Sequence, residues 1–274
     1  MNLSAIIYWN VRPELFHLGF LQPRWYGLFF AIGFVLAYSL LSKAFRREEI
    51  SEVETYRVFL YVFFGTLIGA RLGHILFYDP LYYFSHPLEI LQIWHGGLAS
   101  HGGTIGIVIA LWLYARNTKG VSFIWIVDRV ALVCLATAAS VRIGNLFNSE
   151  IIGRATDLPW AFVFERIDNI PRHPAQLYEA LCYVAILGLL WKMYNKLGPK
   201  IAPGKITGVL LILVFSARFL IEFVKEVQEP FEQGLPLDMG QILSIPFVLV
   251  GIWLWARSRK YAEQYRNLYG FDDN

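Results

Sequence analysis

The sequence predicts an all-α polytopic membrane protein, with one integral membrane domain over residues 1–274 and seven transmembrane helices. Hydrophobic residues make up 56% of the 274 residues and charged residues only 16%, whereas an ordinary globular domain carries about 25% charged residues. Seven apolar stretches are long enough to cross a hydrocarbon core about 30 Å thick. Lys and Arg residues gather between alternate stretches, which is typical of membrane proteins. This composition excludes soluble, disordered, collagen-like and coiled-coil chains.

The seven stretches follow one another along most of the chain. Trp residues stand near the ends of several, as expected for side chains at a membrane–water interface. The apolar segment Leu81–Trp94 is interrupted by Pro87 and is too short to cross, so we expect it to lie along an interface. The predicted spans are Trp25–Ser42, Val58–Tyr78, Leu98–Ala115, Phe123–Asn145, Ala175–Tyr194, Ile206–Phe223 and Gly240–Ala256.

The distribution of positive charge predicts the orientation of these spans. Fourteen of the 24 Lys and Arg residues fall between spans on one side, and six fall on the other. Because cytoplasmic loops are enriched in Lys and Arg, the N-terminus is expected outside and the C-terminus in the cytoplasm. The remaining four arginines lie inside predicted spans. One of them, Arg129, follows Asp128 near an inner end, where we expect the two to form an interfacial ion pair.

Polar residues within the spans gather in the half of the membrane that this orientation makes the outer half. Ionisable groups at such depth are costly and usually face a protein interior or a wet cavity. The pattern therefore predicts an outward-facing polar cavity. Arginine matches phosphate oxygens well, so Arg71, Arg142 and Arg218 would suit a phospholipid head group. The residues concerned are Tyr26, Arg71, His74, Tyr78, His101, Arg142, Asn145, Gln176, Glu179, Arg218, Glu222 and Gln241.

Glycines mark two further features. Gly65, Gly69 and Gly73 recur every four residues, so they form one helix face that lets another helix approach closely. His95 and His101 each precede two glycines. Those glycines fit either backbone contact with a ligand or the start of a helix.

Several kinds of site are missing from the sequence. It contains no HExxH zinc motif, no GxSxG nucleophile elbow and no lysine in the seventh span that could hold retinal. Cys134 and Cys182 lie in apolar stretches without metal-ligand spacing. No resident metal, cofactor or nucleic-acid partner is therefore expected. A multi-pass transporter or lipid-binding membrane protein remains an alternative, because it would also place charges in a cavity. A receptor-like protein is a weaker one, because the cavity is rich in arginine.

Five ordered segments resemble the bacterial phosphatidylglycerol–prolipoprotein diacylglyceryl transferases. The most specific is the run RIGNLFNSEIIG, at Arg142–Gly153. The other four are GGLASHG, RHPAQLYE, RFLIEF and MGQILS. Together with Tyr26, these segments spread over most of the chain, so the match is not one expected by chance.

The resemblance implies an enzyme of the bacterial cytoplasmic (inner) membrane whose active site faces the outer, periplasmic or extracellular side. Such an enzyme moves the diacylglyceryl group of phosphatidylglycerol onto the lipobox cysteine of a prolipoprotein, as the first step of lipoprotein maturation. The product is a thioether, and glycerol 1-phosphate leaves. Because the nucleophilic cysteine belongs to the substrate, the cysteines of this chain need not be catalytic.

The resemblance also suggests roles for the polar residues. His101 is the candidate general base, since the thiolate is the nucleophile. Arg142 and Arg218 are the candidate catalytic cations that stabilise the leaving phosphate, and Arg142 also binds the lipid head group. Among the other candidate substrate-binding residues, Asn145, Asn148 and Glu150 hold the glycerol hydroxyls or order the Arg142 loop. Glu222 orients Arg218, and Tyr26 supports the head group or the base.

Overall fold

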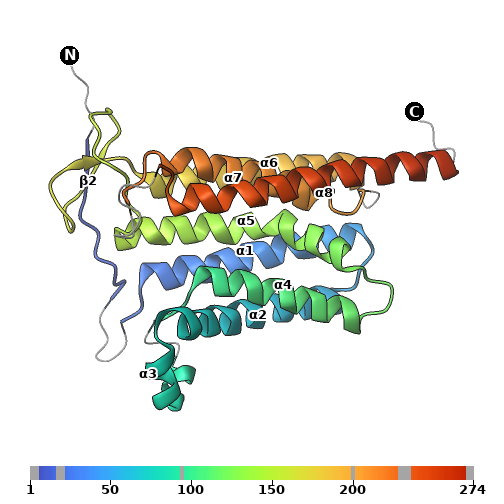
Figure 1. Cartoon of the computed structure of the whole chain (residues 1–274), viewed down its shortest axis with the longest axis horizontal. Helices are drawn as coiled ribbons and strands as arrows, with labels where there is room; N and C mark the ends of the chain where they lie inside the picture. Colours follow the sequence, from blue (N-terminus) through green and yellow to red (C-terminus); the bar gives the residue numbers. More distant parts are fainter. Residues whose placement is uncertain (1–5, 17–21, 93–95, 199–200, 228–235, 270–274) are drawn as a thin grey trace. The chain divides into compact units, whose positions relative to one another are not determined.

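Figure 1 shows the computed structural model of the chain, which describes residues 6–16, 22–92, 96–198, 201–227 and 236–269. The chain forms two compact units. One unit combines Met1–Leu40 with Val130–Asn274, and the other is Leu41–Arg129. Trp94 and His95 lie outside the described residues.

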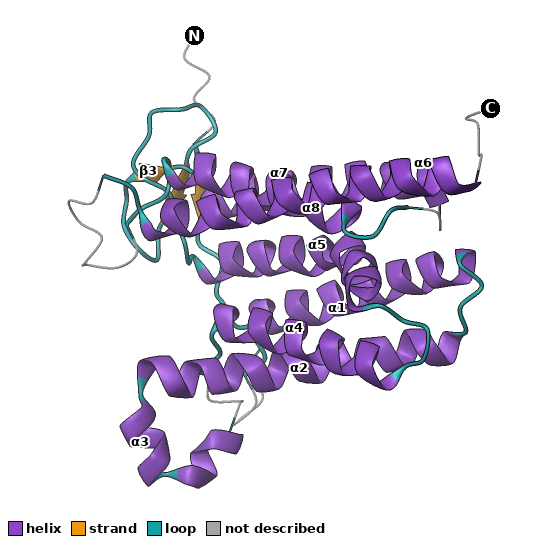
Figure 2. Ribbon diagram, turned by 45° about the vertical axis from the view of Figure 1, so that its right-hand side comes forward, coloured by secondary structure: helices purple, strands orange, loops and turns teal. Residues whose placement is uncertain are grey.

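The described residues are mostly helical, and each of the seven predicted spans contains a long helix (Figure 2). Five helices are long and apolar enough to cross a membrane. These five are α1 (Trp25–Arg47), α2 (Glu52–Tyr78), α5 (Phe123–Asn148), α6 (Ala175–Leu197) and α8 (Met239–Tyr269, apolar as far as Lys260). The chain is therefore compatible with a polytopic membrane protein.

The other two predicted spans contain shorter helices. Both α4 (Ser100–Asn117) and α7 (Lys205–Glu222) have 18 residues. Helix α7 carries three charged residues, and α4 has polar residues at both ends. The segment after α2 forms two short helices, α3 (Pro80–Ser85) and the 3₁₀ helix η1 (Pro87–Leu91).

In the Leu41–Arg129 unit, α2 and α4 lie side by side with almost no side chains between them (Figures 1 and 2). A Cβ on Gly73 would lie 2.6 Å from the Cα of Gly102, and a Cβ on Gly65 would lie 2.7 Å from the carbonyl oxygen of Gly106. The glycine face predicted from the spacing in α2 is confirmed, and its partner is the glycine-rich start of α4. Such close backbone approach is the usual basis of helix association in lipid.

The α5 arginine of the same unit has a different partner from the one expected. Arg129 Nη2 lies 3.1 Å from Glu48 Oε2, and both side chains are almost fully buried. The guanidinium also lies over the ring of Trp125, 4.4 Å from its centroid. The prediction that Arg129 pairs with its neighbour Asp128 is wrong. Adjacent residues on a helix point in different directions, so the side chain reaches a residue far along the chain instead.

The larger unit contains three helices packed in sequence, with α7 against both α6 and α8 (Figure 1). Beside their ends lies a small sheet that was not predicted. In this sheet β1 (Ile7–Trp9) runs parallel to β2 (Phe162–Phe164), which pairs antiparallel with β3 (Pro171–Arg172). Strands of two or three residues are too short to show an alternating pattern. The fold is mostly helical and compatible with the predicted all-α class, with this small sheet in addition.

The sheet is fixed to the end of α5. Leu146, Phe162 and Phe164 form a buried cluster, against which Trp9 packs. The Trp9 indole N–H donates to the carbonyl of Leu146 over 3.0 Å. The turn that follows α5, where the signature run continues, is thereby attached to a rigid platform.

Candidate active site

Arg142 lies on the last two turns of α5 and is held from two sides. Its Nε forms an ion pair with the carboxylate of Glu179 on α6. Its Nη1 donates to Asn145 Oδ1 over 3.0 Å. The Glu179 side chain is 1% exposed, whereas that of Arg142 is 16% exposed. The buried carboxylate of Glu179 thus orients the Arg142 guanidinium, and part of the guanidinium surface stays accessible.

The turn after α5 brings a second carboxylate to this network. Glu150 accepts from Asn145 Nδ2 and from Asn148 Nδ2, each over 3.1 Å. Its backbone carbonyl accepts from the fully buried Gln176 over 2.5 Å. Three of the predicted substrate-binding residues, Asn145, Asn148 and Glu150, therefore lie in direct contact with one another.

The same turn is strained. Ser149 and Ile151 both have a φ of 56°, in the left-handed region. This conformation is uncommon for residues other than glycine, and it is especially unfavourable for a β-branched side chain. Such strain is typical of functional sites, where the surrounding structure enforces it. Here Glu150, which lies between the two residues, is held by the hydrogen bonds from Gln176 and from the two asparagines.

A lysine that was not predicted completes the buried charges. Lys225 Nζ lies 2.9 Å from Glu222 Oε2 and 3.3 Å from Glu179 Oε1, and its side chain is 4% exposed. Charges of alternating sign therefore run through Arg142, Glu179, Lys225 and Glu222. The prediction that Glu222 orients Arg218 is wrong, because its carboxylate turns to Lys225.

Arg218 is the other predicted catalytic cation, and its surroundings differ from those of Arg142. It is half-buried on α7. Among the residues that the structure describes, none forms a hydrogen bond or an ion pair with its guanidinium. A cation at this depth is costly without a partner, so its charge is available to an anionic ligand.

Tyr26 joins the site from the first turn of α1. A Cβ on Gly144 would lie 3.1 Å from the Cα of Tyr26, so the glycine lets α1 and α5 approach closely at this level. Gln241, at the start of α8, is also buried. It donates to the carbonyl of Phe219 over 3.3 Å and thus connects α8 to α7.

The glycine that ends the signature run has no space for a side chain. A Cβ on Gly153 would lie 2.5 Å from the Cβ of His173. Its N–H donates to the carbonyl of His173 over 3.0 Å, and the next residue, Arg154, donates to the carbonyl of Lys225 over 2.8 Å. The run therefore positions the backbone that carries Lys225.

Arg172 connects the sheet to this loop. Its guanidinium lies 2.6 Å from Asp168 Oδ2 and 2.6 Å from Glu226 Oε2. The hydrogen bond from Arg172 holds the pKa of Asp168 below its usual value. Burial lowers the pKa of His173, which lies next to Arg172 in the chain, so its ring is neutral near neutral pH.

Asp168→Asn is expected to lower the free energy of unfolding at neutral pH by at most about 1 kcal/mol, because the ion pair is partly exposed. A carboxyl with a lowered folded-state pKa stabilises the fold fully above its unfolded pKa of about 3.9 and loses this effect as pH falls through the folded pKa. The difference between wild type and variant should therefore shrink in acid. Thermal unfolding in detergent at neutral pH and near the unfolded pKa measures it, and a difference that grows in acid would contradict the assignment.

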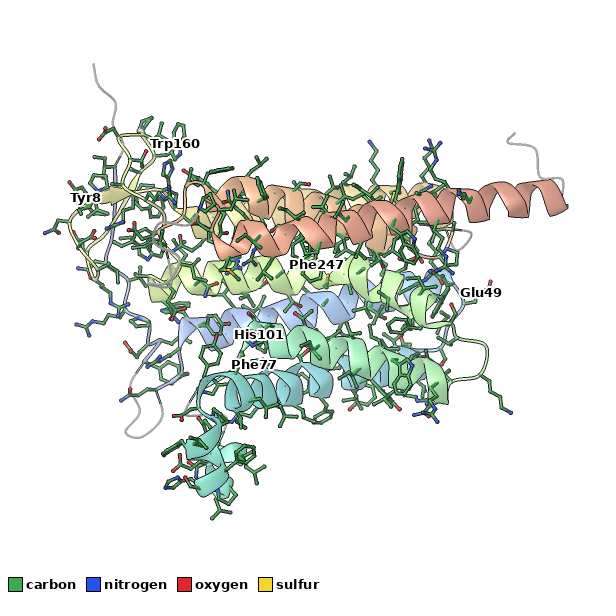
Figure 3. The ribbon with its side chains drawn as sticks, viewed as in Figure 1. Tyr8, Glu49, Phe77, His101, Trp160 and Phe247 are labelled. Atoms are coloured by element: carbon green, nitrogen blue, oxygen red, sulfur yellow. The ribbon has the colours of Figure 1, made fainter. Side chains whose placement is uncertain are left out.

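His101 belongs to the Leu41–Arg129 unit, on the first turn of α4. Its ring is exposed and packs edge-on to Phe77, with centroids 5.2 Å apart, as Figure 3 shows. The ring of Tyr78 is 6.1 Å away. The predicted base, His101, is therefore accessible beside the C-terminal end of α2. The other predicted site residues all lie in the larger unit.

Arg71 does not provide the third cation that the sequence suggested. Its guanidinium is buried and donates to four backbone carbonyls, those of Glu89, Ile90, Gly96 and Gly97. Four of its five N–H donors face peptide groups of the chain, so the guanidinium cannot present two parallel donors to an anion. Among the described residues, no three His, Cys, Asp or Glu side chains are grouped as a metal site would need.

Comparison with known proteins identifies the family of the chain. Residues 13–257 match the family of prolipoprotein diacylglyceryl transferases. A phosphatidylglycerol–prolipoprotein diacylglyceryl transferase of Chloroherpeton thalassium is 47% identical over 96% of this chain and 98% of its own length. Proteins of the same name from Bacteroides fragilis (48% identical over 92% of this chain and 95% of theirs) and Cupriavidus necator (40% over 93% and 96%) are also similar. The chain belongs to the prolipoprotein diacylglyceryl transferase family.

Proposed function

We propose that this protein transfers the diacylglyceryl group of phosphatidylglycerol to the thiol of the lipobox cysteine of prolipoproteins. The observation that carries the proposal is the Arg142 network. A partly exposed guanidinium, fixed by buried Glu179, lies beside the strained turn of Glu150. In addition, relatives that match nearly the full length of the chain carry the transferase name. A rigid cation beside hydrogen-bonding amides suits a phosphate ester that bears a glycerol.

The reaction is a displacement at carbon. The substrate sulfur forms a bond to the terminal glycerol carbon of the diacylglyceryl group, and the bond from that carbon to the phosphate oxygen breaks. The electron pair of that bond leaves with glycerol 1-phosphate, and the thiol proton goes to a base. Negative charge therefore moves from sulfur to phosphate during the step. Cations fixed near the phosphate stabilise this transition state more than the ground state.

Arg142 and Arg218 are suited to different parts of this task. Arg142 is oriented by Glu179 and Asn145, so it presents a fixed edge of its guanidinium to the head group. No described residue forms a hydrogen bond or an ion pair with Arg218, so the phosphate can become its counter-ion. Asn148 Oδ1 is buried without a hydrogen bond in the described residues. That acceptor could bind a glycerol hydroxyl beside Glu150, and Tyr26 supports the same head group.

We place this site at the outer face of a bacterial inner membrane. The proposal has seven spans, formed by α1, α2, α4, α5, α6, α7 and α8, with the N-terminus outside and the C-terminus in the cytoplasm. The excess of Lys and Arg in the alternate loops supports that orientation. Helix α7 is then a span whose polar residues are buried or half-buried, as ionisable groups in membranes normally are, and α4 is a span with exposed polar residues near its two ends, close to the membrane surfaces.

His101→Gln is expected to lower the transfer rate by about 10²–10⁴, the usual contribution of a general base. A free thiol ionises near pH 8.5, so the variant should regain activity as pH rises towards that value, while the wild type changes less. His86→Gln, which changes an exposed histidine of the same unit, is the control. Wild-type rates for His101→Gln at neutral pH would show that another group takes the proton.

The function itself can be tested with purified protein in detergent, phosphatidylglycerol and a lipobox peptide. We expect mass spectrometry to find a diacylglyceryl mass gain on the peptide, together with released glycerol phosphate. A peptide with Ala in place of its Cys is the control and should gain nothing. No gain with a folded sample across several anionic lipids would contradict the proposal and favour a lipid-binding or transport protein.

A further inference from the structure

A buried tyrosine on α6 has no role in the reaction proposed above. Tyr183 lies one helical turn after Glu179, so the two side chains lie on the same face of the helix. Glu179 is the carboxylate that orients Arg142. Tyr183 is only 6% exposed, and a buried hydroxyl is costly without a partner. Its surroundings therefore indicate what it does.

The Tyr183 side chain interacts with both proposed catalytic cations. Its hydroxyl is within hydrogen-bonding reach of the Arg142 guanidinium. It also interacts electrostatically with Arg218 on α7, the helix that packs against α6 (Figure 1). Arg142 comes from α5 and Arg218 from α7, so one hydroxyl on α6 lies in the electrostatic field of cations from two other helices.

The hydrogen-bonding capacity of these groups fixes the direction of the contact with Arg142. A guanidinium has only N–H donors, so the phenol oxygen of Tyr183 accepts from it and the phenol O–H is not used. Neither carboxylate oxygen of Glu179 receives a hydrogen bond from a described residue. In the part of the chain that the structure describes, no other group accepts from Tyr183 either. The O–H is therefore a donor that still has no acceptor.

The proposed transfer step creates an acceptor for this donor. The diester phosphate of phosphatidylglycerol carries a single negative charge, and a phosphate monoester such as glycerol 1-phosphate carries about 1.5 to 2 near neutral pH. The electron pair of the broken carbon–oxygen bond stays on the phosphate oxygen. A hydrogen bond to that oxygen strengthens as the charge grows. The proton stays on Tyr183, because a phosphate monoester is a much weaker base than a phenolate.

The geometry of a displacement at carbon decides between two roles for the hydroxyl. The sulfur enters on the side of the carbon opposite to the leaving oxygen. Arg142 and Arg218 are assigned to the phosphate, so a hydroxyl beside them lies on the leaving side and is not placed to take the thiol proton. Tyr183 therefore complements His101 rather than replacing it.

We propose that Tyr183 is a third phosphate-binding group of the active site, whose O–H donates to the oxygen that leaves the glycerol carbon while its own oxygen accepts from Arg142. The inference rests on the proposed function, because it assigns the residue to the same phosphate. A hydroxyl that accepts from a cation is a stronger donor, since linked hydrogen bonds polarise one another. Arg142 thus acts on the phosphate both directly and through Tyr183.

Tyr183→Phe removes the hydroxyl and keeps the buried ring, so the fold should be retained. We expect kcat for transfer to a lipobox peptide to fall by about 10², as when one donor to an oxyanion is removed. The KM for phosphatidylglycerol should change less, because the hydrogen bond is strongest in the transition state. Tyr194→Phe, which changes another buried tyrosine of α6, is the control. A wild-type kcat in folded Tyr183→Phe would overturn the proposal.

Binding of glycerol 1-phosphate tests the same contact without the transfer reaction. A ligand that binds the folded state raises Tm, and the dependence of Tm on its concentration gives Kd. We expect Tyr183→Phe to raise this Kd by about tenfold, a usual effect of losing a hydrogen bond to a charged group. Tyr194→Phe should leave it unchanged. Equal Kd values for wild type and Tyr183→Phe would contradict a donor to the phosphate.

The Arg142→Ala background separates a direct donor from a residue that only positions Arg142. A direct donor predicts that Tyr183→Phe weakens glycerol 1-phosphate binding further in this background. No further loss would show that Tyr183 acts only through the guanidinium, and the donor role would be wrong. These binding measurements need no peptide, so they also separate the inference from the proposed function. A wild type that does not transfer, yet binds glycerol 1-phosphate through Tyr183, would contradict the transferase assignment alone.

Discussion

Replacing Arg142 with alanine is expected to lower the rate of diacylglyceryl transfer by about 10²–10³, the cost of removing a fixed donor from a developing oxyanion. The effect should fall mainly on kcat, because charge on the phosphate oxygen increases in the transition state. Arg142→Lys should recover little, since an ammonium group cannot present two parallel donors to Glu179 and the phosphate. Transfer to a lipobox peptide, followed by mass spectrometry, measures both variants.

The buried charges predict that Arg142→Ala still folds. Glu179 keeps Lys225 as a partner at 3.3 Å when the guanidinium is removed, so no carboxylate is left buried alone. Arg259→Ala is a suitable control, because that guanidinium lies over Trp255 near the other end of α8 and has no role in the proposed site. An Arg142→Ala protein that inserts normally and transfers at the wild-type rate would remove Arg142 from the mechanism.

The sequence predicts the helices and the signature residues well because both depend on local patterns. Apolar stretches of about 20 residues can hardly form anything but membrane helices. The glycine face of α2 predicts close packing against another helix, and the structure confirms it with α4. Residues of one short run, such as Asn145, Asn148 and Glu150, meet because a helix end and a tight turn bring them together.

Partners from distant parts of the chain are harder to predict. Arg71 shares a membrane depth with Arg142 and Arg218, but only the path of the chain after α2 shows that peptide carbonyls surround it. Glu222 and Arg218 have the spacing of a helical pair, yet a nearer cation binds the carboxylate. Lys225 follows α7 and reads as an ordinary loop charge. The burial of Lys225 depends on the loop of Gly153 and Arg154, and Arg154 lies 71 residues earlier in the chain.

Lys225→Met is expected to have the second large effect, a loss of about 3–5 kcal/mol of stability, as when one partner of a buried ion pair is removed. Glu222 would lose its described cation, and Glu179 would keep only Arg142. The orientation of Arg142 should suffer through Glu179, so the transfer rate should fall even at temperatures where the variant is folded. Thermal unfolding in detergent and the peptide assay measure the two effects.

The double variant Lys225→Met/Glu222→Gln separates a general loss of packing from the loss of charge balance. It removes one positive and one negative charge from the buried set and leaves Arg142 with Glu179, so it should recover much of the stability and rate lost in Lys225→Met. Lys225→Arg, which keeps the charge, should also be more stable and transfer faster than Lys225→Met. If Glu222→Gln lowered the stability of Lys225→Met by as much as it lowers the stability of the wild type, the two residues would not interact. The alternating charges through Arg142, Glu179, Lys225 and Glu222 would then not act as one unit.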